Sequence, residues 1–223
     1  MVKKPQRSRG VEIVPTITVY NITDYNRAIR RYSKFAHRIS IDLMDGQLAP
    51  TRSINPIQAY WPTYIRADLH LMYREPLAET LTLISLNPHL VVIHAEADGN
   101  LMAMIEDLAA VGIKTGLALL PPTQPHQAAK LIKAVDHLLI FGGQLGSYGG
   151  QFDPNLLDKV AQARSIKPDL EISWDGGVNL HNARQIVAAG VDVLNVGGYI
   201  ARAHSAQNAY ARLVRAVNKV VQS

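Results

Sequence analysis

The chain has 223 residues, of which 48% are hydrophobic and 18% are charged, and its formal net charge is +5. This composition excludes a disordered chain, and the length fits one large globular domain or two small ones. The absence of cysteine excludes disulfide bonds, thiolate metal sites and cysteine nucleophiles.

No apolar run approaches the ~18 residues of a membrane span, and the start of the chain has no apolar segment long enough for a signal peptide. We therefore expect a cytoplasmic protein without a membrane partner. Residues 1–10 contain four Lys or Arg and no acid, which predicts a mobile basic tail. The modest charge does not indicate nucleic-acid binding, and it is equally compatible with a basic active-site mouth for an anionic substrate.

Strand-like and helix-like segments alternate along the chain. The expected strands span residues 11–18, 38–42, 65–70, 90–94, 114–120, 137–141, 171–175 and 193–196. The expected helices span residues 22–35, 77–86, 101–111, 124–135, 154–166, 179–189 and 205–221. Residues 45–62 are expected to be irregular, with three prolines and one short helical turn near Pro56.

Eight strands that alternate with helices predict a parallel sheet with right-handed crossovers, an α/β fold. Eight such units in about 220 residues match a (β/α)8 TIM barrel. A doubly wound open sheet is the alternative, but its glycine-rich loop would follow the first strand, whereas the glycine loops here come late. No linker or composition shift divides the chain, so we expect a single domain over residues 1–223.

Chemically distinctive residues lie near the carboxyl ends of the expected strands. In chain order they are Thr16, Asp42, His70, Glu96, the glycine-rich segment 143–150, Asp175 and Gly197-Gly198. In a (β/α)8 barrel this end carries the active site. A polar residue often ends a strand because a loop begins there, but His70 and Asp175 close apolar runs, where a buried charge is costly without a partner.

Two glycine pairs, Gly176-Gly177 and Gly197-Gly198, follow the seventh and eighth expected strands. Barrels often bind phosphate at these positions through backbone N–H groups, which glycine leaves accessible. The two pairs therefore predict a phosphate site, and a pair of tight turns is the alternative.

Motifs through nearly the whole chain, all in one order, resemble the ribulose-phosphate 3-epimerase family. They are Val14-Pro15-Thr16-Ile17, Asp42-Leu43-Met44-Asp45-Gly46, Asp68-Leu69-His70-Leu71-Met72, Ile93-His94-Ala95-Glu96, Gly146 to Gln151 and Trp174-Asp175-Gly176-Gly177-Val178-Asn179. The resemblance implies a barrel of the ribulose-phosphate-binding type that inverts C3 of a ketose phosphate, D-ribulose 5-phosphate/D-xylulose 5-phosphate or a related sugar, through an enediolate. It also implies one divalent metal (Zn, Fe, Mn or Co) and a homo-oligomer, either a dimer or a hexamer.

The resemblance also implies residue roles. Asp42 and Asp175 would be the catalytic acid and base, and Asp42, His70 and Asp175 would be metal ligands. The substrate and phosphate contacts would be Thr16, His70, Gly146, Gly149, Gly150, Gly176, Gly177, Gly197 and Gly198, and the apolar wall would be Met44 and Met72. Epimerisation needs one carboxylate to take a proton and one protonated carboxyl to give one, so their pKa values must differ.

The chain departs from the family around the substrate. Ser40 stands where the family has a metal-binding histidine, and a hydroxyl is a poor ligand for these metals. Three of four protein ligands remain, and water, His37, His94 or the absence of a metal are all open for the fourth position.

The glycine loop at residues 142–150 also departs, with one extra residue and no Asn-Pro. Arg52 and Arg202 are unusual cations at their positions, where they could read an extra anionic group or lie solvated on the surface.

We therefore expect a sugar-phosphate 3-epimerase. One alternative, motivated by Ser40 and the altered loop, is a non-catalytic or altered-specificity sugar-phosphate-binding barrel. Another is a different phosphate-binding barrel, such as an indole-glycerol-phosphate or phosphoribosyl enzyme, which would not need both aspartates.

Overall fold

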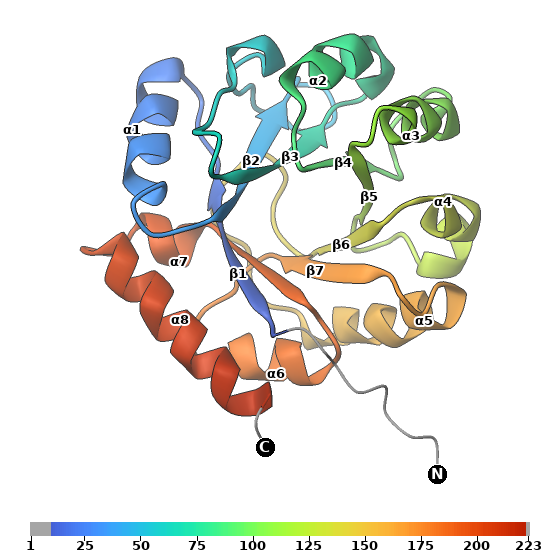
Figure 1. Ribbon diagram of the computed structural model, residues 1–223. Helices are drawn as coiled ribbons and strands as arrows, with labels where there is room; N and C mark the ends of the chain where they lie inside the picture. Colours follow the sequence, from blue (N-terminus) through green and yellow to red (C-terminus); the bar gives the residue numbers. More distant parts are fainter. Residues whose placement is uncertain (1–9, 222–223) are drawn as a thin grey trace.

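The structure, a computed structural model, describes residues 10–221. Eight parallel strands form a closed barrel in sequence order, and β8 pairs with β1 to complete it (Figure 1). The strands are β1 (Glu12–Ile17), β2 (Arg38–Met44), β3 (Arg66–Met72), β4 (Leu90–His94), β5 (Lys114–Leu119), β6 (His137–Phe141), β7 (Glu171–Asp175) and β8 (Val193–Val196). The predicted TIM barrel is confirmed, and the open sheet is wrong. The predicted basic tail, apart from Gly10, lies outside the described residues.

Helices surround the strands (Figure 1). They are α1 (Ile22–Tyr32), α2 (Thr80–Leu86), α3 (Leu101–Ala110), α4 (Ala129–Ala134), α5 (Asp158–Ile166), α6 (Ala183–Ala188), α7 (Gly198–Ala201) and α8 (Ala206–Val221). Short 3-10 helices are η1 (Pro56–Gln58), η2 (Pro76–Glu79), η3 (Pro125–Ala128) and η4 (Pro154–Leu157). Among residues 10–221, no helix combines the length and the apolar character that a membrane span requires.

Three predicted helices are each a 3-10 turn followed by an α-helix. The turns η2, η3 and η4 all begin with proline, which fits a first turn because its missing N–H would have had no helical partner there. The helix predicted from residue 179 begins at Ala183 instead. The side chains of Asn179 and Asn182 both donate to the carbonyl of Gly177, at 3.0 and 2.9 Å, and these contacts compete with helical hydrogen bonds.

Strands β2 and β3 extend two residues beyond their predicted ends, so Asp42 and His70 lie within strands. The two strands pair in register over seven residues, from Arg38 opposite Arg66 to Met44 opposite Met72. Both methionines are 2% exposed and belong to the apolar cluster inside the barrel. Their burial explains why the ladder continues past the polar residues.

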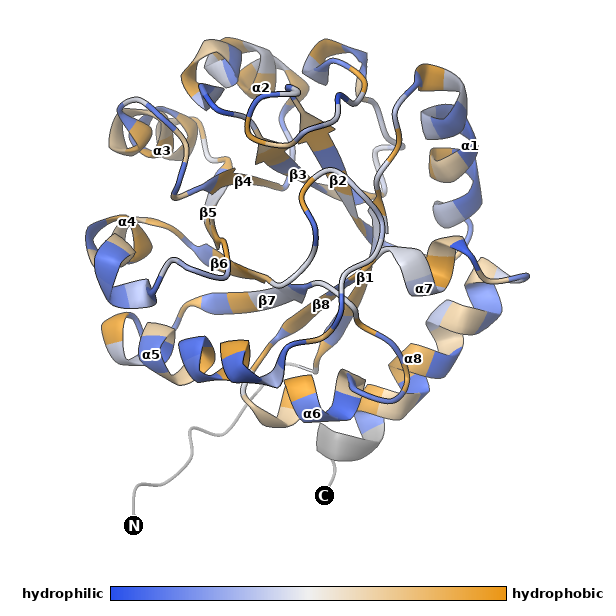
Figure 2. Cartoon of the chain, turned by 180° about the vertical axis from the view of Figure 1, so that it is seen from behind, coloured by the Kyte–Doolittle hydropathy of each residue, from blue (hydrophilic) through white to orange (hydrophobic). Residues whose placement is uncertain are grey.

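Alternation of side chains divides the core into two parts. The outer faces of the strands pack against the helices in one large cluster, and the helices carry hydrophobic and hydrophilic residues along their length, as one buried face requires (Figure 2). A smaller cluster fills the inside of the barrel with Met44, Ala49, Met72, Leu90, Val92, Ala118, Leu139 and Phe141. In the same view, connections that are mostly near the middle of the hydropathy scale cross the barrel opening.

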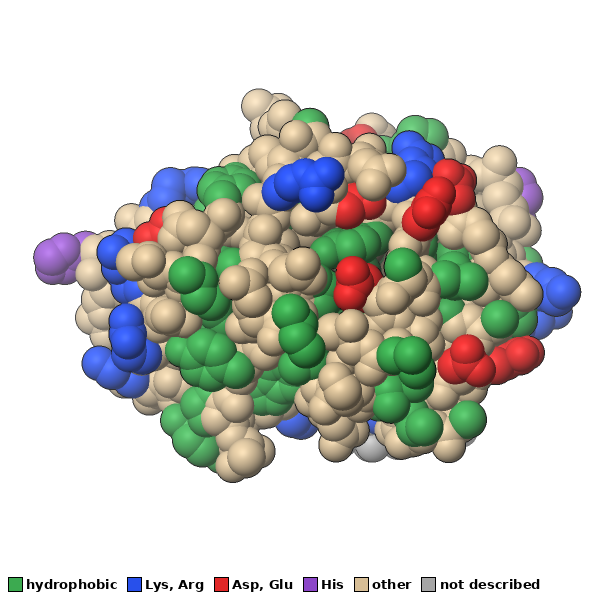
Figure 3. Space-filling view, turned by 90° about the horizontal axis from the view of Figure 1, so that it is seen from above, with side chains coloured by type: hydrophobic (Ala, Val, Ile, Leu, Met, Phe, Trp, Pro, Cys, Tyr) green, Lys and Arg blue, Asp and Glu red, His purple; other side chains and the backbone are tan. Residues whose placement is uncertain are grey.

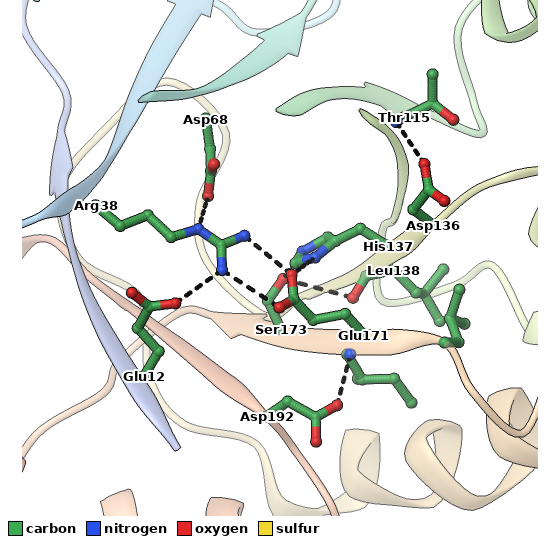
Figure 4. Close-up of polar contacts among 12 residues, drawn as sticks. Glu12, Arg38, Asp68, Thr115, Asp136, His137, Leu138, Glu171, Ser173 and Asp192 are labelled. Carbon is green, nitrogen blue, oxygen red and sulfur yellow. Dashed lines mark hydrogen bonds and ion pairs between the residues drawn. The ribbon is translucent and has the colours of Figure 1, made fainter. Parts of the chain in front are cut away.

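The amino end of the barrel is closed by a charged network around Arg38 (Figure 4). The guanidinium of Arg38 donates to Asp68 at 2.7 Å, to Glu171 at 2.9 Å and to Glu12 at 3.0 Å. His137 connects Glu171 to the hydroxyl of Ser173, at 2.7 and 2.6 Å. The inside of the barrel therefore changes from charged at this end, through an apolar middle, to the polar carboxyl end.

On the face in Figure 3, acidic and basic side chains are dispersed among uncharged ones and form no continuous basic surface. This face offers no stripe of the kind that nucleic-acid binding requires.

Candidate active site

A cavity of about 200 Å³ opens at the carboxyl end of the barrel. The predicted site residues that line it are Thr16, Asp42, Met72, Gly149, Gly150, Asp175, Gly176, Gly177, Gly197 and Gly198. They come from β1, β2, β3 and β7 and from the connections after β6, β7 and β8. The fold therefore brings together residues that are up to 182 positions apart in sequence, since Thr16 and Gly198 line the same cavity.

Two carboxylates and an imidazole converge at the cavity. Asp42, His70 and Asp175 each offer a ligand atom within 4.8 Å of the others. The register explains the convergence, because Asp42 pairs with His70 across β2 and β3. The hydroxyl of Thr18 donates to one oxygen of Asp42 at 2.5 Å, and Nδ1 of His70 lies 3.0 Å from the other. Asp42 is thus held at both oxygens.

The two carboxyl groups, those of Asp42 and Asp175, differ in their electrostatic surroundings. Burial raises the pKa of Asp175 well above its usual range, and the negative charge of Asp42 raises it further. Asp175 lines the cavity and keeps part of its surface open there. Asp175 therefore keeps its proton to a higher pH than an ordinary aspartate does, and Asp42 accepts a hydrogen bond from Thr18.

The donor set at this cluster fits a divalent cation. Two carboxylates and a neutral imidazole suit Zn²⁺, Mn²⁺, Fe²⁺ or Co²⁺. Burial lowers the pKa of His94 to about 4, so this ring is neutral at pH 7; its Nε2 lies 2.9 Å from Nε2 of His70, outside the ligand cluster. His37 precedes β2 at the opposite end of the barrel and lines a separate groove, so its candidacy as a fourth ligand is wrong.

Three predicted contacts lie beside the cavity and do not line it. His70 is 1% exposed beneath it. The carbonyl of Gly146 accepts hydrogen bonds from the hydroxyls of Tyr20 and Thr51, at 3.0 and 2.8 Å, and so fastens the glycine-rich loop. Met44 packs behind the cavity lining, where its sulfur lies 3.3 Å from the hydroxyl oxygen of Thr51.

The lining also includes residues that the sequence did not single out, among them Thr18, Tyr148 and Asn195. The hydroxyl of Tyr148 accepts from the amide of Thr18 at 2.9 Å, so the loop after β6 closes against β1. Asn195 pairs with Asp175 across β7 and β8. Its Oδ1 and the hydroxyl of Thr16 are buried without a hydrogen-bond partner among residues 10–221. An amide in the apolar strand β8 was the signal that could have revealed Asn195.

The two unusual arginines have different surroundings. Arg202 lines the cavity, and a Cβ placed on Gly198 would lie 2.5 Å from its Nη2, so this glycine makes room for the guanidinium. Arg52 packs instead against Gly46, away from the cavity lining. Of the two, Arg202 is the cation that can meet an anionic ligand.

Glycines bring the loops after β6 and β7 into backbone contact. Gly176 has φ +131, and a Cβ there would lie 2.3 Å from the carbonyl carbon of Gly142. Gly177 has φ +66, and a Cβ there would lie 2.6 Å from the amide nitrogen of Phe152. No other residue fits either position without moving backbone.

A family model and the relatives found by sequence agree on one family. The model of the Ribulose-phosphate 3 epimerase family matches residues 12–201. A ribulose-phosphate 3-epimerase of Bacillus subtilis is 28% identical over 199 residues, covering 85% of this chain and 92% of the relative. One of Schizosaccharomyces pombe is 26% identical over 219 residues, covering 95% and 96%. A solved 3-hexulose-6-phosphate synthase shares the fold, with a TM-score of 0.71 at 16% identity over 92% of this chain and 99% of that one. The chain belongs to the ribulose-phosphate 3-epimerase family.

Proposed function

We propose that this epimerase inverts C3 of a ketose phosphate and interconverts D-ribulose 5-phosphate and D-xylulose 5-phosphate. The observation that carries the proposal is a pair of unequal carboxyl groups at one cavity, Asp42 and Asp175. A two-base epimerisation needs this inequality, because one group must be ionised when the other is protonated.

In the proposed reaction, ionised Asp42 removes the proton from C3 on one face of the sugar, and protonated Asp175 delivers a proton to the opposite face. The reverse reaction exchanges the two roles. Thr18 and His70 orient Asp42 through its two oxygens. Tyr148 and the glycine-rich loop limit the access of water to the reacting carbon.

A divalent metal held by Asp42, His70 and Asp175 would polarise the substrate carbonyl and stabilise the enediolate. With Ser40 in place of a histidine, these three side chains are the protein ligands that the proposal assigns. The cation is therefore expected to bind more weakly than at a site with four protein ligands.

The phosphate of the substrate is assigned to the two glycine pairs that follow β7 and β8. Gly176, Gly177, Gly197 and Gly198 line the cavity without side chains, and Arg202 adds a positive charge. The unpaired hydroxyl of Thr16 and the unpaired amide oxygen of Asn195 are assigned to hydroxyl groups of the sugar.

The central test is turnover of ribulose 5-phosphate by the purified protein with Zn²⁺, Fe²⁺, Mn²⁺ or Co²⁺, followed by NMR. Asp42→Asn and Asp175→Asn should each lower kcat by about 10²–10⁴-fold, because each removes one of the two proton-transfer groups. Asp98→Asn is the control, since this side chain is 63% exposed and outside the cavity. Absence of turnover of any ketose phosphate with any of these metals would exclude the proposal.

A second candidate is a sugar-phosphate-binding barrel with altered specificity or without catalysis, favoured by Ser40 and by the amide of Asn195 in the cavity. It predicts that ketose phosphates raise the Tm without being converted. The predicted dimer or hexamer and the predicted cytoplasmic location stay predictions, and light scattering would measure the first.

A further inference from the structure

The loop after β6 carries one side chain that reaches β1. Tyr148 belongs to this loop, and its ring lies against Gly197, where a Cβ would be only 2.8 Å from Cδ1 of the tyrosine. The pairing of β1 with β8 ends just before this point, at Pro15 opposite Val196. The ring of Tyr148 therefore occupies a space beside the end of β1 that the glycine at position 197 leaves open.

The hydroxyl of Tyr148 bonds to the backbone of the chain where β1 ends. It accepts the amide of Thr18 at 2.9 Å and donates to the carbonyl of Thr16 at 3.4 Å. The strand itself ends at Ile17, so Thr18 lies one residue beyond it. The amide of Thr18 is thus held by a side chain that is 130 positions away in the sequence.

Thr18 is also the residue that holds one oxygen of Asp42. Its hydroxyl donates to this carboxylate at 2.5 Å, and Asp42 is buried. Tyr148 fixes the backbone of Thr18, and the side chain of Thr18 fixes Asp42, so the three residues connect the glycine-rich loop to the carboxylate. A shift of the Thr18 backbone would move its hydroxyl, and the strength of a hydrogen bond falls steeply when its geometry is lost.

We propose that Tyr148 is a positioning residue for the reaction: its hydroxyl fixes the backbone of Thr18 and thereby directs the Thr18 hydroxyl that orients Asp42. The proposal rests on the role of Asp42 as a base that is assigned above. It gives the loop after β6 a part in arranging the base, in addition to limiting the access of water. Small errors in the orientation of a reacting group are costly in rate, so this contact should affect turnover.

A second tyrosine provides the matched control. The hydroxyl of Tyr20 donates to the carbonyl of Gly146, in the same loop, at 3.0 Å. Tyr20→Phe therefore removes one hydrogen bond that fastens the loop, as Tyr148→Phe does, but it leaves the contact between Tyr148 and Thr18 in place.

The contact can be tested without metal or substrate, by hydrogen exchange of backbone amides followed by NMR. In Tyr148→Phe the amide of Thr18 should exchange about 10-fold faster than in wild type, because it loses its acceptor. In Tyr20→Phe the exchange rate of this amide should be unchanged. Equal rates in wild type and Tyr148→Phe, or the same acceleration in both variants, would overturn the proposal.

The effect on the reaction can be measured by a double-mutant cycle with Thr18→Val, using turnover of ribulose 5-phosphate. Tyr148→Phe alone should lower kcat about 2–10-fold and leave KM nearly unchanged, which is the effect expected of one neutral hydrogen bond. In the Thr18→Val background the same change should lower kcat by less than about twofold, because the hydroxyl through which it acts is absent.

Full additivity of the two changes in kcat would overturn the proposal, because Tyr148 would then act by a route other than Thr18. A Tyr20→Phe variant that loses as much kcat as Tyr148→Phe would also overturn it, since a loosened loop would be the cause. The expected exchange rates in a protein that converts no ketose phosphate would overturn the proposed function alone, since the link from Tyr148 to Thr18 would stand.

Discussion

Two aspartates at one cavity differ because of the side chains around them. One oxygen of Asp42 accepts a hydrogen bond from the hydroxyl of Thr18, and the other lies beside Nδ1 of His70. Asp175 is raised in pKa by burial and by the charge of Asp42. At the scale of single residues, the difference between these two carboxyl groups therefore comes from their neighbours, which include Thr18 after β1 and His70 on β3.

Thr18 offers a direct test of this division. Thr18→Val removes the hydroxyl that donates to Asp42 at 2.5 Å and should lower kcat about 10–100-fold, since a hydrogen bond to a charged group contributes about 1.5–3 kcal/mol. Thr18→Ser keeps the hydroxyl and should stay near wild type in kcat. If Thr18→Ser lost as much activity as Thr18→Val, packing of the threonine methyl would be the cause, and the orienting role would be wrong.

Arg202 tests the assignment of the phosphate. Arg202→Gln should raise KM for the ketose phosphate about 10–100-fold and leave kcat nearly unchanged, because a charge-assisted contact far from C3 acts in the ground state and in the transition state alike. Arg52→Gln is the matched control, as Arg52 lies against Gly46 and outside the cavity lining. A fall in kcat with an unchanged KM would place Arg202 at the reacting end of the substrate.

The sequence singled out Asp42, His70 and Asp175, because an ionisable residue in an apolar strand is costly to bury without a partner, and the structure brings the three together. It did not predict Thr18 or Asn195, since a hydroxyl and an amide cost less to bury and occur in many strands. The sequence could not decide whether Arg202 lies on the surface or at the cavity, because only the fold shows that Gly198 leaves space for its guanidinium.

At the scale of elements, the site depends on loops that meet backbone to backbone. The barrel and the order of its strands could be predicted from short apolar runs that alternate with helical segments, because parallel strands covered on both faces are apolar throughout. The late start of α6 could not, because it depends on side-chain hydrogen bonds from Asn179 and Asn182 to one carbonyl. The β6 connection likewise depends on contacts to Tyr20 and Thr51, which are distant in sequence.

Gly176 tests the contact between the loops after β6 and β7. Gly176→Ala should destabilise the protein by more than about 2 kcal/mol and lower activity, since its methyl would lie 2.3 Å from the backbone of Gly142 in addition to straining a backbone at φ +131. Gly112→Ala is the control: it also has a positive φ, +83, but nothing lies within 4 Å, so it should cost only about 1 kcal/mol. Chemical denaturation measures both, and equal losses would mean that the loops separate easily.

At the scale of the whole molecule, the barrel has a charged network at one end and the cavity at the other, with an apolar cluster between them. At the charged end, the buried guanidinium of Arg38 forms ion pairs with three carboxylates, those of Glu12, Asp68 and Glu171. The negative charge exceeds the positive charge beside Asp68, which is 3% exposed and has one oxygen without a partner among residues 10–221. Burial, together with the charges of Glu171 and Glu12, raises the pKa of Asp68 to about 7 although Arg38 opposes the shift.

This pKa predicts how stability depends on pH. The folded-state pKa of Asp68 is raised to about 7 from the model-peptide value of 3.8, so between these two values the folded protein keeps a proton that the unfolded chain has released. The stability from this group is complete below about pH 4 and is lost as the pH rises toward 7.

In the variant Asp68→Asn the side chain at this position does not titrate. The free energy of unfolding of wild type relative to Asp68→Asn should therefore fall by roughly 2–4 kcal/mol from pH 4 to pH 7, given about 1.4 kcal/mol per pKa unit. Urea unfolding at both pH values measures the difference, with the exposed Asp98→Asn as a control that should show none. A wild type that gains stability relative to Asp68→Asn over this range would mean that Asp68 is ionised throughout and that Arg38 outweighs its burial.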